Sequence, residues 1–203
     1  MQFPNSHTNN DIILKLTDNY LKLNDYNNTN NSVELLKNKK SAEYLNFKSL
    51  ILEASGARAE AAKLYQSVID EAPAINSSNE QFLLKILDYY QSGEPAVYLN
   101  YLKNIVNTKQ FVNPDILSEL TIKLADYYFN DRNFEEAILY YWKIILEQNA
   151  KNNFEYSYYK IITAYINLNE PAKAKIQFNR FAAAYPESSY LENLLKYEVL
   201  NEK

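Results

Sequence analysis

One spacing of side chains occurs three times in this chain. An alanine is followed four residues later by an aromatic residue, and three residues after that by another apolar residue. The three sets are Ala61, Tyr65 and Val68; Ala137, Tyr141 and Ile144; and Ala174, Phe178 and Phe181. Residues three or four apart lie on one face of a helix, so each set predicts a helix with a small residue on its packed face. The alanine lets a neighbouring antiparallel helix approach closely, and the aromatic residue one turn later fills the gap where the axes diverge.

The same register extends upstream into a preceding helix. Twelve residues before the three alanines lie Ser49, Ala125 and Ile162. Three residues after those lie Leu52, Tyr128 and Tyr165. Each unit is therefore predicted to be a pair of antiparallel helices. Such a pair still exposes an apolar face, which the next pair covers when the pairs stack in a row.

Glycine and proline agree with an all-helical chain. Only Gly56 and Gly93 occur, too few for a fold rich in tight hairpins, a phosphate-binding loop or a dinucleotide fingerprint. Pro95, Pro114 and Pro171 stand where new helices are expected, because a proline in the first turn gives up no hydrogen bond. Gly93 is expected to end a helix in the left-handed conformation.

Capping residues mark further helix starts. Asn113 precedes Pro114 as an expected N-cap. Asn133 and Ser189 are each followed three residues later by a glutamate, which is the spacing of a capping box. These positions predict that helices begin near residues 114, 134 and 188.

This register resembles the tetratricopeptide repeat. Its marked positions are matched in units at about 42–75, 118–151 and 155–188, and Gly56 occupies the glycine that the family favours between the two helices. The unit at about 79–110 is degenerate, with Val97 at the alanine position and Tyr101 four residues later. The segment 9–39 has helical patterning without a match. The resemblance implies an all-α, right-handed superhelical solenoid of about five antiparallel helix pairs plus a C-terminal helix at 188–201. It would occupy residues 9–203 as one repeat domain, after a flexible tail at 1–8.

The last matched unit resembles a narrower group of repeats. Its residues spell F-x-x-F-x-x-x-Y-P-x-S-x-Y, from Phe178 to Tyr190. This pattern is similar to the repeats of bacterial envelope scaffolds, such as outer-membrane assembly lipoproteins and periplasmic cell-division coordinators. The resemblance implies a bacterial interaction scaffold, although the lipidated cysteine of the lipoproteins is missing here.

Charge and composition exclude several classes of function. The net charge is −4 and no run of lysine or arginine occurs, so nucleic-acid binding is not expected. No stretch is long and apolar enough for a membrane span. The absence of cysteine fits a cytoplasmic protein and equally an envelope protein that avoids thiols. The sequence as written predicts a cytoplasmic protein. A periplasmic one follows if Met1 replaced a removed targeting segment, and the compartment stays open.

No catalytic or metal-binding constellation can be assembled from these residues. His7 is the only histidine, so neither a nucleophile–base triad nor an ordinary zinc site is available. Asp131, Glu135 and Glu136 cluster at a helix start, where acidic residues complement the helix dipole. Trp142 is the only tryptophan, which disfavours a sugar-binding cleft. We therefore expect a non-enzymatic protein without cofactor or metal.

Aromatic residues off the packing positions point to partner binding. The resemblance implies that the first helix of each pair lines a concave groove. Carried over by register, the groove residues are Asn46, Leu50, Glu53, Ile122, Asp126, Phe129, Tyr156, Tyr159, Thr163 and Ile166. Exposed aromatic and aliphatic side chains there suit the capture of a peptide or helix of another protein. The competing interpretation is that neighbouring repeats or the ends of the chain cover these side chains.

A second hypothesis is structural. The chain would be an assembly module of a larger complex, possibly envelope-associated in the sense of the resemblance above, and would act through its convex face or its last helix. That helix carries Tyr190, Leu191, Leu194, Leu195, Val199 and Leu200. A terminal helix of an array normally presents a polar outer face. Its apolar character therefore predicts docking onto a second copy of the chain.

Overall fold

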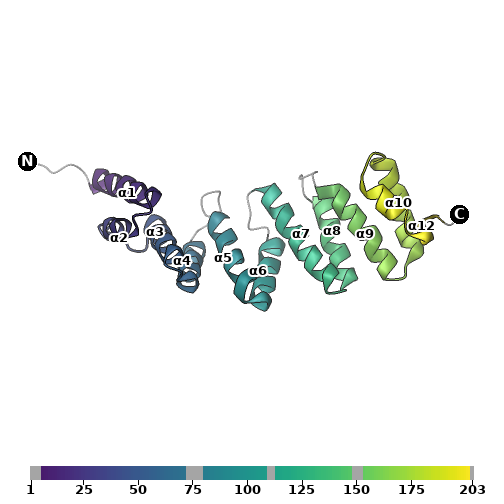
Figure 1. Cartoon of the computed structure of the whole chain (residues 1–203), viewed down its shortest axis with the longest axis horizontal. Helices are drawn as coiled ribbons and strands as arrows, with labels where there is room; N and C mark the ends of the chain where they lie inside the picture. Colours follow the sequence, from purple (N-terminus) through teal and green to yellow (C-terminus); the bar gives the residue numbers. More distant parts are fainter. Residues whose placement is uncertain (1–5, 72–79, 109–112, 148–152, 202–203) are drawn as a thin grey trace, which may run out of the picture. The chain divides into compact units, whose positions relative to one another are not determined.

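The computed structural model describes residues 6–71, 80–108, 113–147 and 153–201. Within these ranges the chain forms twelve α-helices and no strand (Figure 1). The helices are α1 (Ser6–Lys22), α2 (Tyr26–Val33), α3 (Ala42–Ala54), α4 (Arg58–Glu71), α5 (Glu80–Gly93), α6 (Pro95–Thr108), α7 (Pro114–Asn130), α8 (Phe134–Glu147), α9 (Phe154–Asn167), α10 (Pro171–Ala184), α11 (Tyr190–Leu194) and α12 (Glu198–Asn201). The prediction of an all-α repeat fold is confirmed.

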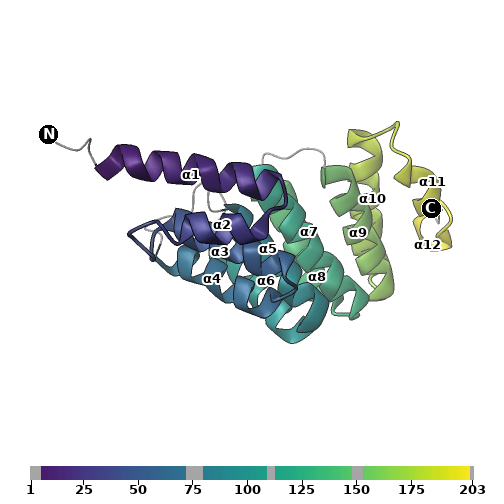
Figure 2. The same ribbon diagram turned by 60° about the vertical axis from the view of Figure 1, so that its left-hand side comes forward.

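The helices group into two compact units, Met1–Tyr98 and Leu99–Lys203, which meet within α6. In the first unit, each helix from α1 to α4 packs against the next helix in the sequence. In the second unit the same order holds from α7 to α10, and α11 packs on α9 while α12 packs on α10 (Figure 2). The sequence predicted one domain over 9–203, whereas the structure has two compact units.

The turn inside four of the helix pairs has one geometry. A single residue in each turn has a positive φ, between 56° and 83°: Asn24, Gly56, Arg132 and Asn169. The next residue's N–H bonds to a carbonyl five residues back, as Ala57 does to Leu52 at 2.9 Å. Gly56 adopts this conformation at least cost, since it has no Cβ. The shared turn aligns the pairs residue by residue.

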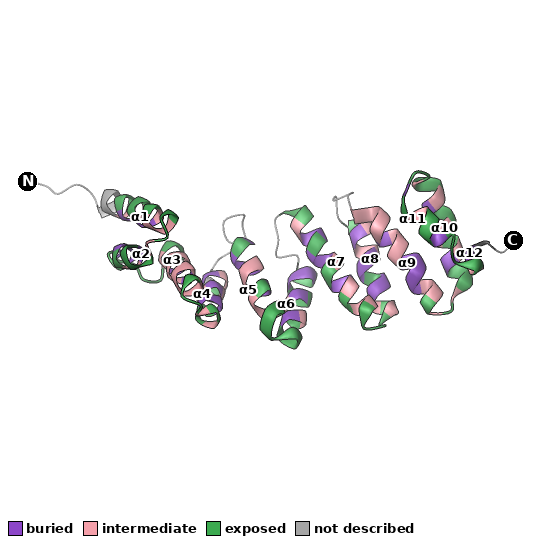
Figure 3. Cartoon of the chain, viewed as in Figure 1, coloured by how far each residue is buried: buried purple, intermediate pink, exposed green. Residues whose placement is uncertain are grey.

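The small residues of the predicted register are buried at equivalent places. Ala61, Ala137 and Ala174 each follow the left-handed residue by five positions and are at most 1% exposed. In Figure 3 the helices α5, α6 and α7 each carry both buried and exposed stretches. The prediction that these alanines lie on the packed face of their helices is confirmed.

The pair α1–α2 belongs to the same register, although no match was predicted there. Counting from Asn24 places Thr29 at the alanine position and Thr17 at the position of Ser49 and Ala125. Both threonines are fully buried, and the Thr17 hydroxyl donates to the Ser32 hydroxyl at 3.0 Å. Threonine is small enough to pack between the two helices, and its hydroxyl is hydrogen-bonded locally. The repeat was not recognised in the sequence because a threonine stands where the register has alanine.

The degenerate unit is shifted by one residue from its predicted register. Val97 is 38% exposed, whereas Tyr98, Leu102 and Ile105 are buried, so the packed face of α6 begins at Tyr98. Gly93 is the last residue of α5 and has no positive φ, so its expected left-handed cap is wrong. The Glu94 N–H bonds to the Tyr90 carbonyl at 2.8 Å, which continues the helical pattern up to Pro95.

The N-terminal boundary also differs from the prediction. Helix α1 begins at Ser6 and includes His7, so residues 6–8 are not a tail. Extending a helix by a turn costs little once its packed part has formed, and Ile13 and Thr17 anchor that part in the core. Residues 1–5 of the predicted tail lie outside the described residues.

The predicted C-terminal helix at 188–201 is two short helices, α11 and α12. Leu194 and Leu200 are both buried against Ile162, Ala174 and Phe181. On one straight helix, side chains six residues apart point to different faces, so both leucines reach the core only if the helix breaks.

Two of the expected helix caps are present. Asn113 accepts a bond from the Asp115 N–H at 2.9 Å, and Asn133 accepts one from the Glu136 N–H at 3.4 Å. The Ser189 side chain makes no capping bond, and the neighbouring Ser188 hydroxyl accepts from the Tyr190 N–H at 3.4 Å instead.

Candidate partner-binding face

The ten predicted groove residues lie on the first helices of three pairs. They come from α3 (Asn46, Leu50, Glu53), α7 (Ile122, Asp126, Phe129) and α9 (Tyr156, Tyr159, Thr163, Ile166). Nine of them are half-buried and Thr163 is 4% exposed. The Thr163 hydroxyl donates to the carbonyl of Tyr159 at 3.1 Å or that of Lys160 at 3.0 Å within its own helix. Thr163 therefore presents almost no surface to a partner.

In the second unit, α7, α8 and α9 meet at Asp126. The Tyr156 hydroxyl donates to Asp126 Oδ1 at 2.7 Å, and the Tyr141 hydroxyl donates to the same oxygen. The two rings meet edge-on with centroids 6.2 Å apart. Burial raises the pKa of both tyrosines, and the bond to Asp126 raises it further. Two neutral donors thus hold the carboxylate in place.

Lys160 lies between aromatic rings on the same face. Its Nζ is 4.1 Å from the ring centroid of Phe129 on α7 and 5.5 Å from that of Tyr156 on α9. Such contacts are favourable because a ring's face carries negative charge density. The half-buried Phe129 also meets Phe134 edge-on at 5.2 Å, which fixes its ring.

The C-terminal segment covers part of α9. The ring of Tyr190, on α11, stacks on that of Tyr159 at 4.9 Å and lies 6.2 Å from that of Tyr156. Burial raises the pKa of Tyr159, with further contributions from Tyr197 and Tyr190. Tyr159 is therefore engaged by the chain's own end, as the competing interpretation of the sequence expected for some of these side chains.

The first unit presents different chemistry at the position of Phe129. Counted from the shared turn, that position is Glu53, whose carboxylate pairs with Lys85 of α5. The Lys85 Nζ also lies 5.2 Å from the ring centroid of Tyr65, which stacks on Phe82 at 5.4 Å. The Tyr65 hydroxyl is buried and makes no hydrogen bond of ordinary geometry, although burial and the nearby Glu53 raise its pKa.

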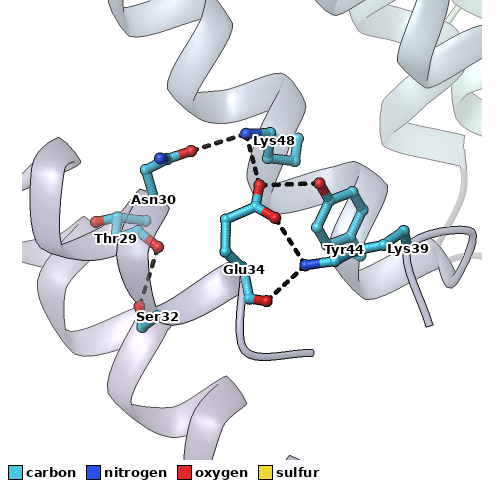
Figure 4. A network of polar contacts seen from close by, with 7 residues as sticks. All are labelled: Thr29, Asn30, Ser32, Glu34, Lys39, Tyr44 and Lys48. Carbon is cyan, nitrogen blue, oxygen red and sulfur yellow. Dashed lines mark hydrogen bonds and ion pairs between the residues drawn. The ribbon is translucent and has the colours of Figure 1, made fainter. Parts of the chain in front are cut away.

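A second polar cluster joins α2 to α3 (Figure 4). The Glu34 carboxylate accepts bonds from Lys39 at 2.7 Å, from Lys48 at 3.0 Å and from the Tyr44 hydroxyl at 3.0 Å. Lys48 also donates to the Asn30 side chain at 2.7 Å. The bonds from Lys39 and then Lys48 lower the pKa of Glu34 to about 2. This cluster links one pair to the next through hydrogen bonds and ion pairs, and Lys39 Nζ also lies 4.7 Å from the ring centroid of Tyr44.

Three residues of the second unit's face were missed from the sequence. Tyr141 occupies a packing position, and nothing in the spacing shows that its hydroxyl reaches Asp126. Lys160 stands one residue after a groove position, so the register alone passed over it. Tyr190 was noted only as part of the terminal pattern. Tyr190 lies five residues after Tyr185, beyond the turn at Pro186, so no helical spacing relates it to α10. Its contact with α9 could therefore not be predicted from the sequence.

Neither metal binding nor membrane insertion is indicated by the described residues. Over the ranges given above, no three histidine, cysteine, aspartate or glutamate side chains are grouped to hold a metal ion. None of the helices described has the length and apolarity to cross a membrane.

The comparisons with known proteins agree with this geometry. The family model of the tetratricopeptide repeat matches residues 156–188. The crystal structure of MamA is 16% identical, with 93% of this chain and 94% of that one covered at a TM-score of 0.53. That of YrrB, described as a tetratricopeptide-repeat protein with an unusual peptide-binding site, is 12% identical, with 91% of each chain covered at a TM-score of 0.52. No curated protein matches the sequence significantly.

The matched segment contains Ala174, Phe178 and Phe181, the same set that the spacing singled out. The two structural relatives extend the likeness in fold over at least 91% of the chain. Residues 156–188 thus match a tetratricopeptide repeat, and the fold of the chain is similar to that of MamA and to that of YrrB, which is described as a tetratricopeptide-repeat protein.

Proposed function

We propose that this protein is a non-catalytic interaction scaffold that binds a segment of another protein on the α7–α9 face of its second unit. The observation that carries the proposal is the group of half-buried side chains there: Phe129, Tyr156 and Lys160, with Ile122 and Ile166 on the same helices. Aromatic rings held by their neighbours lose little entropy when a partner covers them, so they suit recognition.

Two further points support this proposal. The fold is that of proteins whose repeats serve protein–protein contacts, and one structural relative is described as having a peptide-binding site. The Asp126 cluster fixes Tyr156 before any partner arrives, and a preformed surface binds more tightly than one that must be ordered. Tyr159 and Thr163 are left out of the proposed contact, since Tyr190 covers the first and the second is buried.

The test is selection of ligands from a random peptide library displayed on phage, with the full chain as the target. Peptides enriched on the wild-type chain are then titrated against Phe129→Ala and Leu139→Ala by fluorescence anisotropy. Leu139, on α8, is 62% exposed and lies outside the proposed face, so it is the matched control. We expect Phe129→Ala to weaken binding about tenfold or more and Leu139→Ala to leave it unchanged. Full-strength binding to a folded Phe129→Ala chain would refute the assignment.

The assembly hypothesis keeps one observation in its favour. Leu195 is 51% exposed beside the buried Leu194, and an exposed leucine at the end of the fold suits a contact with a second copy. Light scattering of the wild-type chain and of Leu195→Lys distinguishes the outcomes. A wild-type dimer that Leu195→Lys disrupts supports assembly through this segment. If the wild-type chain and the variant are both monomeric, the segment only caps the end of the fold.

A further inference from the structure

Lys160 is a cation held on an aromatic surface without a carboxylate partner. Among the residues that the structure describes, no acidic oxygen lies within ion-pair distance of its Nζ, and its printed contacts are the rings of Phe129 and Tyr156. Asp126, the nearby acid of α7, is engaged by the hydroxyls of Tyr141 and Tyr156. The side chain is half-buried, so its charge is less hydrated than that of a lysine at the surface.

In the first unit, a lysine on the first helix of a pair has a carboxylate partner from the preceding pair. There Lys85, from the first helix of the next pair, pairs with Glu53. Glu53 and Phe129 occupy the same register position, four residues after Ser49 and Ala125 respectively. The second unit has replaced the internal carboxylate with a ring, which leaves the charge of Lys160 available to an incoming group.

We propose that Lys160 binds the side-chain carboxylate of an aspartate or glutamate in the partner segment, while Phe129 and Tyr156 contact an apolar residue next to it. This inference rests on the proposed function and specifies its ligand as an acidic segment. An ammonium flanked by rings gains a strong charge-assisted hydrogen bond when a carboxylate arrives, because water is already partly excluded. The ammonium of a lysine is a compact charge and does not form the two parallel hydrogen bonds that an arginine forms with a carboxylate. One lysine can nevertheless bind one acidic side chain.

The test uses the same phage-displayed library on the full wild-type chain, Lys160→Gln, Lys160→Arg and Lys85→Gln. Wild-type selection should enrich peptides with an aspartate or glutamate at a fixed place beside an apolar residue. Against such a peptide, Lys160→Gln should lose about tenfold in affinity, and Lys160→Arg should keep most of it. Lys85→Gln is the matched control and should bind as the wild type does.

Synthetic variants of the selected peptide identify the source of the carboxylate. Changing its acidic residue to the amide should weaken binding to the wild-type chain about tenfold and should have no effect on Lys160→Gln, since the two groups act as a pair. Amidating the peptide's C-terminus should change nothing. If amidation alone abolishes binding, the chain recognises a terminal carboxylate and the inference is wrong.

The failure of this inference is distinguishable from the failure of the proposed function. Peptides that require Phe129 but show no acidic preference, or that bind Lys160→Gln at full strength, overturn the role of Lys160 and leave the face intact. A library from which the wild-type chain selects nothing, or only peptides indifferent to Phe129→Ala, overturns the proposed function and this inference with it.

Discussion

The two units place different chemistry on the same backbone register. One position after Ser49 and Ala125 stand Leu50 in the first unit and Asp126 in the second. The tyrosines that follow at the shared packing position are Tyr65 and Tyr141. Because the second unit has an aspartate there, its tyrosine hydroxyl is bonded, whereas the Tyr65 hydroxyl is buried near Glu53 without a hydrogen bond of ordinary geometry.

The position three residues further on reverses the comparison. The first unit has Glu53 there and satisfies Lys85 internally, whereas the second has Phe129 and leaves Lys160 on its rings. In the first unit Lys85 is paired with Glu53, and the Tyr65 hydroxyl has no hydrogen bond of ordinary geometry. In the second unit the hydroxyls of Tyr141 and Tyr156 are both bonded, and the charge of Lys160 stays available to a partner. The helix packing depends on the shared small and aromatic positions. The residues at Leu50 or Asp126 and at Glu53 or Phe129 can therefore differ between the units without changing the fold.

The largest effect is expected from making the second unit resemble the first at Asp126. Asp126→Leu leaves the hydroxyls of the fully buried Tyr141 and the half-buried Tyr156 without their acceptor, and an unsatisfied hydroxyl is costly to the extent that it is buried. We expect the free energy of unfolding, measured with urea, to fall by about 3 kcal/mol. Asp126→Asn keeps an acceptor oxygen and should lose less. Equal losses in the two variants would show that packing, rather than the hydrogen bonds, matters at this position.

Removing the tyrosine hydroxyls one at a time sharpens the same comparison. Tyr141→Phe breaks a bond to a carboxylate and should destabilise the chain by about 2 kcal/mol. Tyr65→Phe removes a buried hydroxyl that makes no hydrogen bond of ordinary geometry, so it should not destabilise the chain and should stabilise it by about 1 kcal/mol. Similar losses in both variants, measured by urea unfolding, would mean that Tyr65 bonds Glu53 in solution and that the contrast is false.

A smaller change in stability, with a large change in recognition, is expected from Phe129→Glu. This substitution gives the second unit the carboxylate of the first, and the new glutamate should pair with Lys160 as Glu53 does with Lys85. Because the pair is partly exposed, stability should change by less than about 1 kcal/mol. Phage selection on this variant should lose its acidic preference. Retained preference would show that Lys160 is not the group that the partner's carboxylate meets.

The repeats were predictable from the sequence wherever a small residue and an aromatic residue mark the packed face. Ala61, Ala137 and Ala174 meet this condition, and the register carried from them gave the helices of the site. Thr29 fulfils the same role with a different residue type, so the first pair was missed. Tyr98 shifted its unit by one position because a large buried residue stands where the register expects a small one.

The chemistry of the face was less predictable, for a physical reason. Register states which helix face a residue occupies, and so it placed Asp126, Phe129 and Tyr156 on the first helices of their pairs, where their role in binding stays a prediction. It does not state how far a long side chain reaches. The contacts of Lys160 with Phe129 and of Tyr190 with Tyr159 depend on that reach and on a break in the last helix, neither of which follows a period of three or four residues.

The smallest expected effect concerns how the units respond to pH. Lys39 and Lys48 lower the pKa of Glu34 to about 2 from its ordinary 4.5, so the folded state favours the charged form. The stability that Glu34 contributes is therefore complete above about pH 4.5 and is lost as the pH falls through 2. The raised pKa values of Tyr141 and Tyr156 act in the opposite sense. Their contribution is complete below the ordinary tyrosine value of 10.0 and declines above it.

Urea unfolding of the wild type and of Glu34→Gln at several pH values tests this difference. Because the side chains of Glu34 and Lys39 are each 43% exposed, the variant should lose less than about 1 kcal/mol near neutral pH. That loss should shrink as the pH falls through 2, below which both chains carry a neutral side chain at this position. Tyr141→Phe should instead approach the wild type on the alkaline side. A Glu34→Gln deficit that persists unchanged in acid would mean that the carboxylate acts there by shape and hydrogen bonding, so the first unit's polar contact would not depend on charge.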